Sequence, residues 1–291
     1  MRKRNRITAF DVLNWLFLAL VALACIIPFI TVIGTSLVSQ EEWSRRSAFV
    51  LFPEKIDFSA YRVLLGNSQI VFRGLLNSVE RVLIGTACNL LVTITYAYVI
   101  SRKRLPGRIF LTYVLFFTMI FNGGLIPTYI LVDSLRLTNS FWALVLPTLL
   151  NPWWLLIMRN FFAAIPEEFE EAAVIDGAKP TMILVQLILP MSLASVATIG
   201  LFYAVHHWNE WFAAFIYIND GQKLPLQVIL RSILIQGLMT ESDAVVDIRT
   251  MPPSQSIKNA LIVITTLPIL MVYPFVQRYF VKGVMVGGIK G

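Results

Sequence analysis

The chain has few charged residues. Only 14% of its 291 residues are Asp, Glu, Lys or Arg, whereas 57% are hydrophobic. Soluble domains carry about 25% charged residues, so this sequence cannot cover a water-facing surface. Lipid is therefore the expected main solvent. We predict an all-α integral membrane protein that forms a single transmembrane domain over residues 1–291.

The sequence also lacks the groups that enzymes and metal sites need. Its two histidines are adjacent, and its two cysteines, Cys25 and Cys88, lie in apolar runs with no partner at metal-ligand spacing. There is no His-Glu-x-x-His motif and no Gly-x-Ser-x-Gly motif. The phosphate-binding loop Gly-x-x-x-x-Gly-Lys-Ser/Thr is missing as well. We therefore expect no catalysis, no metal and no cofactor in this chain.

Six apolar stretches are long enough to cross a bilayer, which takes about 20 residues. They cover residues 12–36, 78–100, 109–132, 141–159, 191–216 and 259–281. The first follows a basic N-terminus and resembles a secretory signal. Its apolar run continues to Leu37, however, so we predict a retained first helix.

Basic residues predict the orientation of these spans. The net charge is +7, but the Lys and Arg residues are split among short inter-span segments and do not gather on one domain. This distribution argues against nucleic-acid binding. Arg102-Lys103-Arg104 forms a dense basic loop that should face the cytoplasm. Segments 1–11, 101–108, 159–182 and 278–291 then lie inside with it, and they hold more than half of the 24 Lys and Arg residues. Both termini are predicted to be cytoplasmic.

Helix-breaking residues are frequent within the predicted spans. They are Pro28, Pro127, Pro147, Pro152, Pro268 and Pro274, together with Gly123-Gly124. Breaks are tolerated where neighbouring helices or a water-filled cavity satisfy the freed backbone groups. They are either ordinary kinks or signs of a closely packed protein that moves.

The cytoplasmic loop 161–190 is predicted to form two short helices joined by a tight turn. Pro166 suits a first helical turn, and four glutamates after it complement the positive helix end. Gly177 is placed to end the helix in a left-handed conformation. Ala172 and Ala173 leave a low stripe where another surface could approach closely.

This loop resembles the "EAA" motif of the permease subunits of bacterial ABC importers. The matching residues are Glu171, Ala172, Ala173, Gly177, Leu187, Leu189 and Pro190, in the family's order and spacing. Asp176, next to Gly177, is a further candidate for coupling to the ATPase. Leu187 stands where the family usually has Ile. The resemblance implies a type I permease fold in which this loop is a coupling helix. Glu171 would act there by its charge or as a helix-stabilising residue.

The same resemblance implies partners and location. The permease would pair with a second permease subunit and with two ATPase subunits that use ATP and Mg. An extracytoplasmic binding protein would deliver the solute, with residues 217–256 meeting it. The complex would lie in the bacterial cytoplasmic (inner) membrane.

Three segments resemble the carbohydrate branch, in particular the second membrane subunit of maltose-type importers. They are residues 122–129, 207–212 and 267–291. The sequences of residues 122–132 and 267–291 resemble those of permeases for oligosaccharides cut from alginate or pectin. The C-terminal tail 282–291, with Gly287, Gly288 and Lys290, resembles a tail that reaches into the ATPase interface. From composition alone it would be a disordered end.

A cluster of polar and aromatic residues is a candidate for the substrate path. It consists of His206, His207, Trp208, Asn209, Glu210 and Trp211 at the outer end of the fifth span. Intramembrane ionisable groups are functional candidates. Equally, His and Asn often bridge helices and Trp belongs to the interfacial belt, so subunit packing or binding-protein contact is the alternative.

Two other functions are open at this stage. A secondary transporter driven by an ion gradient would typically show repeated halves, and no convincing repeat is present. The same permease superfamily also imports amino acids, peptides and phosphate.

Overall fold

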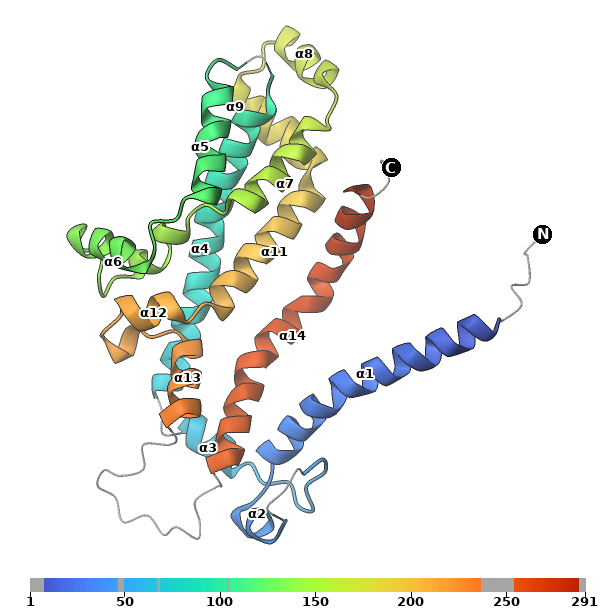
Figure 1. The fold of residues 1–291 in the computed structure, drawn as a ribbon, viewed down its shortest axis with the longest axis vertical. Coiled ribbons are helices and arrows are strands. Elements are labelled where there is room, and N and C mark those ends of the chain that lie inside the picture. Colours follow the sequence, from blue (N-terminus) through green and yellow to red (C-terminus); the bar gives the residue numbers. More distant parts are fainter. Residues whose placement is uncertain (1–7, 47–49, 67–68, 104, 237–253, 288–291) are drawn as a thin grey trace. The chain divides into compact units, whose positions relative to one another are not determined.

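A computed structural model describes residues 8–46, 50–66, 69–103, 105–236 and 254–287 (Figure 1). Every regular element within these ranges is helical, which confirms the predicted all-α class. The chain divides into two compact units. The first comprises residues 1–69 and 230–267, and the second comprises residues 70–229 and 268–291. Two helices, α13 (Leu226–Gln236) and α14 (Ser254–Gly287), contribute residues to both units.

In the first unit, α1 (Ala9–Ser36) begins with a capping box. The Thr8 hydroxyl accepts a hydrogen bond from the Asp11 N–H at 3.3 Å, and the Asp11 carboxylate accepts from the Thr8 N–H at 2.8 Å. Pro28 lies inside this helix without ending it. Most large apolar side chains of α1 are exposed, as expected of a helix whose solvent is lipid.

The C-terminal end of α1 packs closely on its own unit. A Cβ at Gly34 would collide with the carbonyl groups of Val50 and Leu51, so glycine permits this approach. Next to it, the Ser36 hydroxyl lies 2.8 Å from the hydroxyl of Tyr61 on α3 (Ser59–Gly66).

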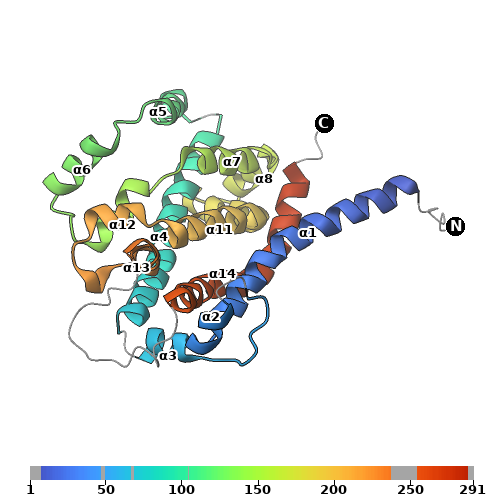
Figure 2. The same ribbon diagram turned by 60° about the horizontal axis from the view of Figure 1, so that its bottom comes forward.

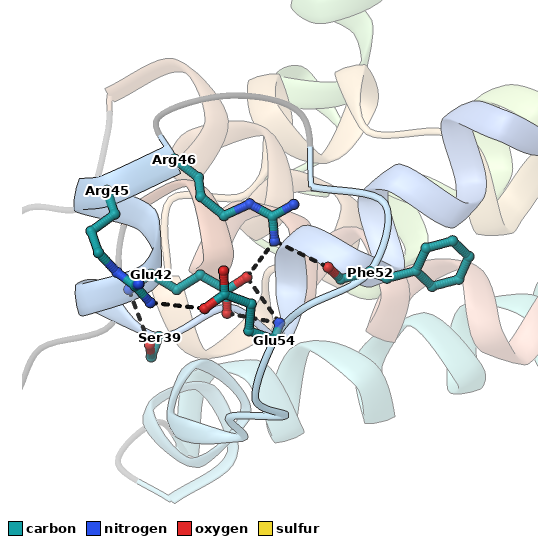
Figure 3. A network of polar contacts seen from close by, with 6 residues as sticks. All are labelled: Ser39, Glu42, Arg45, Arg46, Phe52 and Glu54. Atoms are coloured by element: carbon teal, nitrogen blue, oxygen red, sulfur yellow. Dashed lines mark hydrogen bonds and ion pairs between the residues drawn. The ribbon is translucent and has the colours of Figure 1, made fainter.

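The short helix α2 (Gln40–Arg46) is tied to the segment that follows it (Figure 3). The buried Glu42 carboxylate accepts from the Glu54 N–H at 3.0 and 3.1 Å, and from Arg46 Nη1 at 2.8 Å. Burial raises the pKa of Glu42, but the backbone N–H of Glu54, the Arg46 guanidinium and the backbone of Lys55 outweigh it. The net result is a pKa below the ordinary value.

The core of the second unit lies among α4 (Gln69–Ser101), α5 (Arg108–Ile120), α7 (Pro152–Ala163) and α11 (Leu193–Asn209). Both views show α7 and α11 side by side next to α4 (Figures 1 and 2). The fully buried side chains of this core include Ala97, Ile100, Leu115, Leu155, Met158, Phe162, Ile188, Ile199 and Tyr203.

Three continuous helices of the described residues are long and apolar enough to cross a membrane. They are Ala9–Ser36, Ile70–Ser101 and Gln255–Val272. Three further candidates are helix pairs bent by 117°, 56° and 87° at short breaks. Six crossings result if each bent pair is one span, so the predicted count of six stays a prediction.

The span predicted over 109–132 is not one straight helix. It is α5, then a break, then α6 (Leu125–Ser134), with 117° between them. The break was predicted at Gly123-Gly124 and is observed there: Gly124 has φ +86°, a conformation that favours glycine. The Asn122 side chain stabilises the turn by accepting from the Gly124 N–H at 2.9 Å.

The span predicted over 141–159 also begins irregularly. Two 3₁₀ turns, η1 (Phe141–Leu144) and η2 (Leu146–Thr148), precede α7. Asn151 caps α7 by accepting from the Trp154 N–H at 3.2 Å, and Pro152 takes the first helical position.

The span predicted over 191–216 corresponds to several elements. The chain bends by 87° between the Pro180–Met191 segment, which includes α10 (Leu189–Met191), and α11. α11 then ends at Asn209, and a separate short helix, α12 (Phe212–Tyr217), follows. The predicted outer boundary at 216 therefore merged two helices, because their side chains are similarly apolar.

Candidate functional site

The loop predicted at 161–190 forms α8 (Glu167–Ile175), α9 (Pro180–Met182) and the π-helical segment η3 (Ile183–Ile188). α8 lies at the end of the second unit opposite α12 (Figure 1). Pro166 precedes the helix as its N-cap with φ −56° and ψ 137°, one position earlier than predicted. Three glutamates occupy the first turn, where the helix dipole favours negative charge.

The left-handed cap predicted at Gly177 is confirmed, with φ +81°. Asp176 is the C-cap residue, and the N–H groups of Gly177 and Ala178 bond back to Val174 O at 3.0 Å and Ala173 O at 2.9 Å. These bonds satisfy carbonyl groups that the helix end leaves free. A Cβ at Gly177 would meet nothing within 4 Å, so only the backbone conformation requires glycine here.

The surface of α8 is more apolar than the sequence analysis anticipated. Phe169, Val174 and Ile175 are exposed, Ile175 to 85%. Ala172 is exposed as predicted, but Ala173 is half-buried and packs against the core of its own unit. The outward face of α8 therefore consists of large apolar side chains around Ala172. The helical period of 3.6 residues, applied to the apolar positions of this segment, could have indicated them.

The remaining motif residues lie on α8 itself and on the segment that follows it. Glu171 is exposed on α8 and Pro190 is exposed in α10. Leu187, on η3, is half-buried against the core, as is its neighbour Leu189. The aliphatic positions of the motif thus anchor the segment that leads from α8 to α11.

Two ion pairs join α8 to the C-terminal end of α4 and the loop after it. Arg102 Nη2 lies 2.5 Å from Glu170 Oε1, and both side chains are largely shielded from solvent. The Arg102 guanidinium also lies over the Tyr98 ring, 4.9 Å from its centroid. Burial raises the pKa of Glu170, while Arg102 opposes this shift. The second pair, Lys103 with Glu167, is exposed and spans 3.6 Å.

α4 carries a polar face along its length. Arg81, Gly85, Asn89 and Thr93 follow one another at intervals of four residues and therefore lie on one side of the helix. Arg81, Asn89 and Thr93 are each fully buried. This face was not predicted from the sequence, although an arginine within a predicted span was a signal for it.

Arg81 stabilises the break between α11 and α12 by binding Glu210. Its Nη2 lies 2.7 Å from Glu210 Oε2, and its Nη1 donates to the Glu210 carbonyl at 2.7 Å. The other carboxylate oxygen, Glu210 Oε1, accepts from the Ala213 N–H at 2.8 Å and so caps α12. The pair satisfies backbone groups that the break would leave unbonded in lipid.

Asn89 likewise stabilises the break between η2 and α7. Its amide donates to the carbonyls of Thr148 and Leu149 at 2.7 and 2.8 Å, which fixes its orientation. Asn89 Oδ1 must then accept, so His207 Nε2, 2.6 Å away, carries the proton. Four residues on, Thr93 lies 2.7 Å from the Tyr203 hydroxyl.

The candidate path residues 206–211 have different environments. His207 and Trp208 are buried, and Glu210 is bound to Arg81, so these three pack within the subunit. His206 is half-buried with its ring 6.1 Å from that of Trp154. Asn209 is exposed and donates to the Val205 carbonyl, and Trp211 is half-buried. Only His206, Asn209 and Trp211 remain candidates for a substrate path.

The predicted tail 282–291 lies partly outside the described residues. α14 ends at Gly287, and Gly288 and Lys290 fall beyond the described range. Among the described residues, no group of three or more His, Cys, Asp or Glu side chains could hold a metal ion.

The chain matches one protein family and is similar in sequence to known permease proteins. Residues 82–286 match the family of the "Binding-protein-dependent transport system inner membrane component". The chain is 44% identical over 99% of its length, and 100% of the relative's, to the polygalacturonan/rhamnogalacturonan transport system permease protein YtcP of Bacillus subtilis (strain 168). It is 42% identical to protein LplC of the same organism, over 97% of this chain and 95% of that one.

A solved structure is also similar. It is that of a bacterial ABC transporter involved in the import of the acidic polysaccharide alginate. The match has a TM-score of 0.88 and 30% sequence identity, and it covers 96% of this chain and 99% of that one.

Proposed function

The chain belongs to the family of binding-protein-dependent transport system inner membrane components, and from that premise we propose its role and substrate class. It is the permease subunit of an ATP-binding-cassette importer, a non-catalytic membrane subunit for an oligosaccharide. The observation that carries the proposal is α8, a short helix with a Gly177 cap and an uncovered apolar face.

The substrate class proposed is an acidic oligosaccharide that contains galacturonate. One relative is named for polygalacturonan and rhamnogalacturonan, and the similar structure imports alginate. Polygalacturonan and alginate share one chemical feature: their sugar units carry carboxylates, which are ionised at neutral pH. The identity of 44% over the whole chain favours the galacturonate compounds over alginate fragments.

The exposed surface of α8 supports the proposed partners. Phe169, Val174 and Ile175 are apolar side chains that project from a helix at one end of the unit. Such a patch favours a protein partner, and the proposed partner is one of two ATPase subunits that bind ATP and Mg. A second permease subunit would complete the pathway, and an extracytoplasmic binding protein would deliver the oligosaccharide.

The orientation proposed places α8 and both termini in the cytoplasm of a bacterial cell, with the chain in the inner membrane. The basic loop after α4 supports this orientation, because Lys and Arg accumulate on the cytoplasmic side. That loop lies next to α8, as the pairs of Arg102 and Lys103 with α8 glutamates show.

The test is uptake by the complete complex in proteoliposomes. The membrane subunits, the ATPase and the binding protein are reconstituted, and labelled oligogalacturonides, alginate oligosaccharides and neutral malto-oligosaccharides are supplied in parallel. ATP-dependent uptake should be strongest for oligogalacturonides. Uptake of only the neutral sugars would contradict the proposed substrate class, and gradient-driven uptake by this chain alone would contradict the importer.

A further inference from the structure

Besides the packing of Ala173 on the core, α8 is connected to the membrane helices by two routes of different geometry. Along the chain it leads through Gly177 and α9 into η3, and from there around the 87° bend into α11. η3 is a π-helical segment, a geometry that is rare and is found frequently at functional sites. η3 packs on the core through Ile183 and Ile188, but the 87° bend that follows it interrupts the helix, so this route is less suited than a continuous α-helix to carry a displacement along its axis.

The second route leads sideways through a side-chain contact. Arg102 follows directly on α4, and its guanidinium is held between the Glu170 carboxylate on α8 and the Tyr98 ring on α4. The exposed fractions of the Arg102 and Glu170 side chains are 15% and 16%. Removing one partner of such a shielded pair is costly because it leaves the other charge uncompensated, whereas the exposed pair of Lys103 with Glu167 contributes little.

α4 is suited to carry a displacement over a long distance. It is a continuous helix of 33 residues, and at 1.5 Å per residue about 30 Å of it separates Arg102 from Arg81. Its buried face is bonded to two of the irregular segments of the unit. Asn89 holds the carbonyls at 148 and 149, and Arg81 holds the break between α11 and α12.

We propose that Arg102 is a positioning residue that transmits the movement of α8 to α4 through its ion pair with Glu170. When ATPase closure displaces α8, α4 moves with it and carries along the segments bonded to Arg81 and Asn89. The chain route through η3 follows passively. This inference rests on the proposed function, and it adds a second attachment point outside the loop motif.

The transport test uses the complete complex in proteoliposomes. Its variants are Arg102→Glu, Glu170→Arg, the exchange of both charges, and Arg102→Lys, with Lys103→Glu as the matched control from the exposed pair. The measured quantities are the amount of ATPase retained and the ATP hydrolysed per sugar imported. Single reversals should raise this ratio about tenfold, within the usual range of coupling effects, with the ATPase retained.

The exchange of both charges should bring the ratio of ATP hydrolysed to sugar imported back toward wild type. Arg102→Lys should keep this ratio near wild type, and Lys103→Glu should leave it unchanged. Wild-type ratios in both single reversals would overturn the proposal. Loss of bound ATPase in the reversals would also overturn it, because Arg102 would then support docking and not transmission.

A second measurement is independent of the sugar. Spin labels are placed at Glu168→Cys on α8 and Leu91→Cys on α4, both at exposed positions, in a background with Cys25→Ala and Cys88→Ala. The distance between the labels is compared without nucleotide and after trapping with ATP and vanadate. It should stay constant in the wild-type complex and change in Arg102→Glu.

An equal change of distance in both complexes would overturn the proposal, because α8 and α4 would then move separately. A wild-type complex that imports no acidic oligosaccharide but keeps the label distance constant would contradict the proposed substrate and leave the transmission role supported. The two failures are therefore distinguishable.

Discussion

Gly85 on α4 lies directly against the imidazole of His207 on α11. A Cβ at position 85 would stand 2.6 Å from His207 Nε2, the atom that bonds to Asn89. The absence of a side chain at Gly85 therefore lets α4 and α11 approach closely enough for the polar contact to form. Small residues serve this purpose between membrane helices.

Gly85→Ala should consequently destabilise the protein. The added methyl group must push the His207 ring away, and overpacking of this kind costs about 1–3 kcal/mol. We expect a lower melting temperature in detergent, measured by the loss of the monodisperse chromatographic peak on heating. Gly221→Ala is the matched control, because a Cβ there meets nothing within 4 Å. Equal melting temperatures for the two variants would contradict the close contact.

The buried pair of Arg81 with Glu210 predicts an asymmetry between single and double substitutions. Removing one partner leaves a buried charge unpaired, which costs about 3–5 kcal/mol. Arg81→Met and Glu210→Gln should each reduce the amount of folded protein in the membrane, and the combination should be less harmful than Arg81→Met alone. For comparison, Arg45→Ala breaks a pair whose side chains are 66% and 52% exposed, and it should change stability by less than about 1 kcal/mol. Additive losses in the combination would disprove the coupling.

Gly177 predicts a difference between two substitutions of similar size. Its φ of +81° disfavours a branched side chain by about 1–2 kcal/mol, whereas asparagine tolerates this region. Gly177→Val should therefore abolish sugar-stimulated ATP hydrolysis in proteoliposomes, and Gly177→Asn should retain most of it. Both proteins should insert normally. If Val supported wild-type coupling, the cap would have no role in it.

Ala173→Asp should also uncouple the complex, for a reason that the packing of α8 makes clear. Ala173 is half-buried against the core of its own unit, so a carboxylate there would be desolvated and would push α8 from its seat. Sugar-stimulated ATP hydrolysis is the measurement, and Ala172→Asp, at the exposed neighbour, separates loss of seating from loss of partner contact. Unchanged ATP hydrolysis in Ala173→Asp would show that α8 does not need this seat.

Glu42 predicts a pH dependence in the segment around α2. Because the pKa of Glu42 is lowered by its hydrogen bonds, its stabilising effect is present above the ordinary pKa of the carboxyl group. The effect is lost as the pH falls through the lowered pKa of the folded state. Protection of residues 40–46 and 50–54 against hydrogen exchange, corrected for the intrinsic rate, should therefore decrease as the pH falls below the ordinary pKa of the carboxyl group. Glu42→Gln should have low protection at all pH values, and a persistent acid transition in that variant would assign the effect to another group.

Several features were predictable from the sequence because their causes are local. The position of α8, its acidic first turn and the left-handed Gly177 are encoded within a dozen consecutive residues. The apolar composition of the spans is likewise a property of contiguous segments, and so is the break at Gly123-Gly124. Capping preferences and the preference of glycine for positive φ act over one helical turn, so they need no knowledge of the fold.

The partners of the intramembrane polar groups were decided by the tertiary structure alone. Two interpretations of His207 and Glu210 are compatible with the sequence, because a polar residue in an apolar run has the same sequence pattern whether it binds a sugar or bridges helices. Their partners, Asn89 and Arg81, are 118 and 129 residues away. Which of many polar groups meet across such distances depends on how α4, α11 and the broken segments pack. Lipid then makes each match obligatory, because no water is present to replace a missing partner.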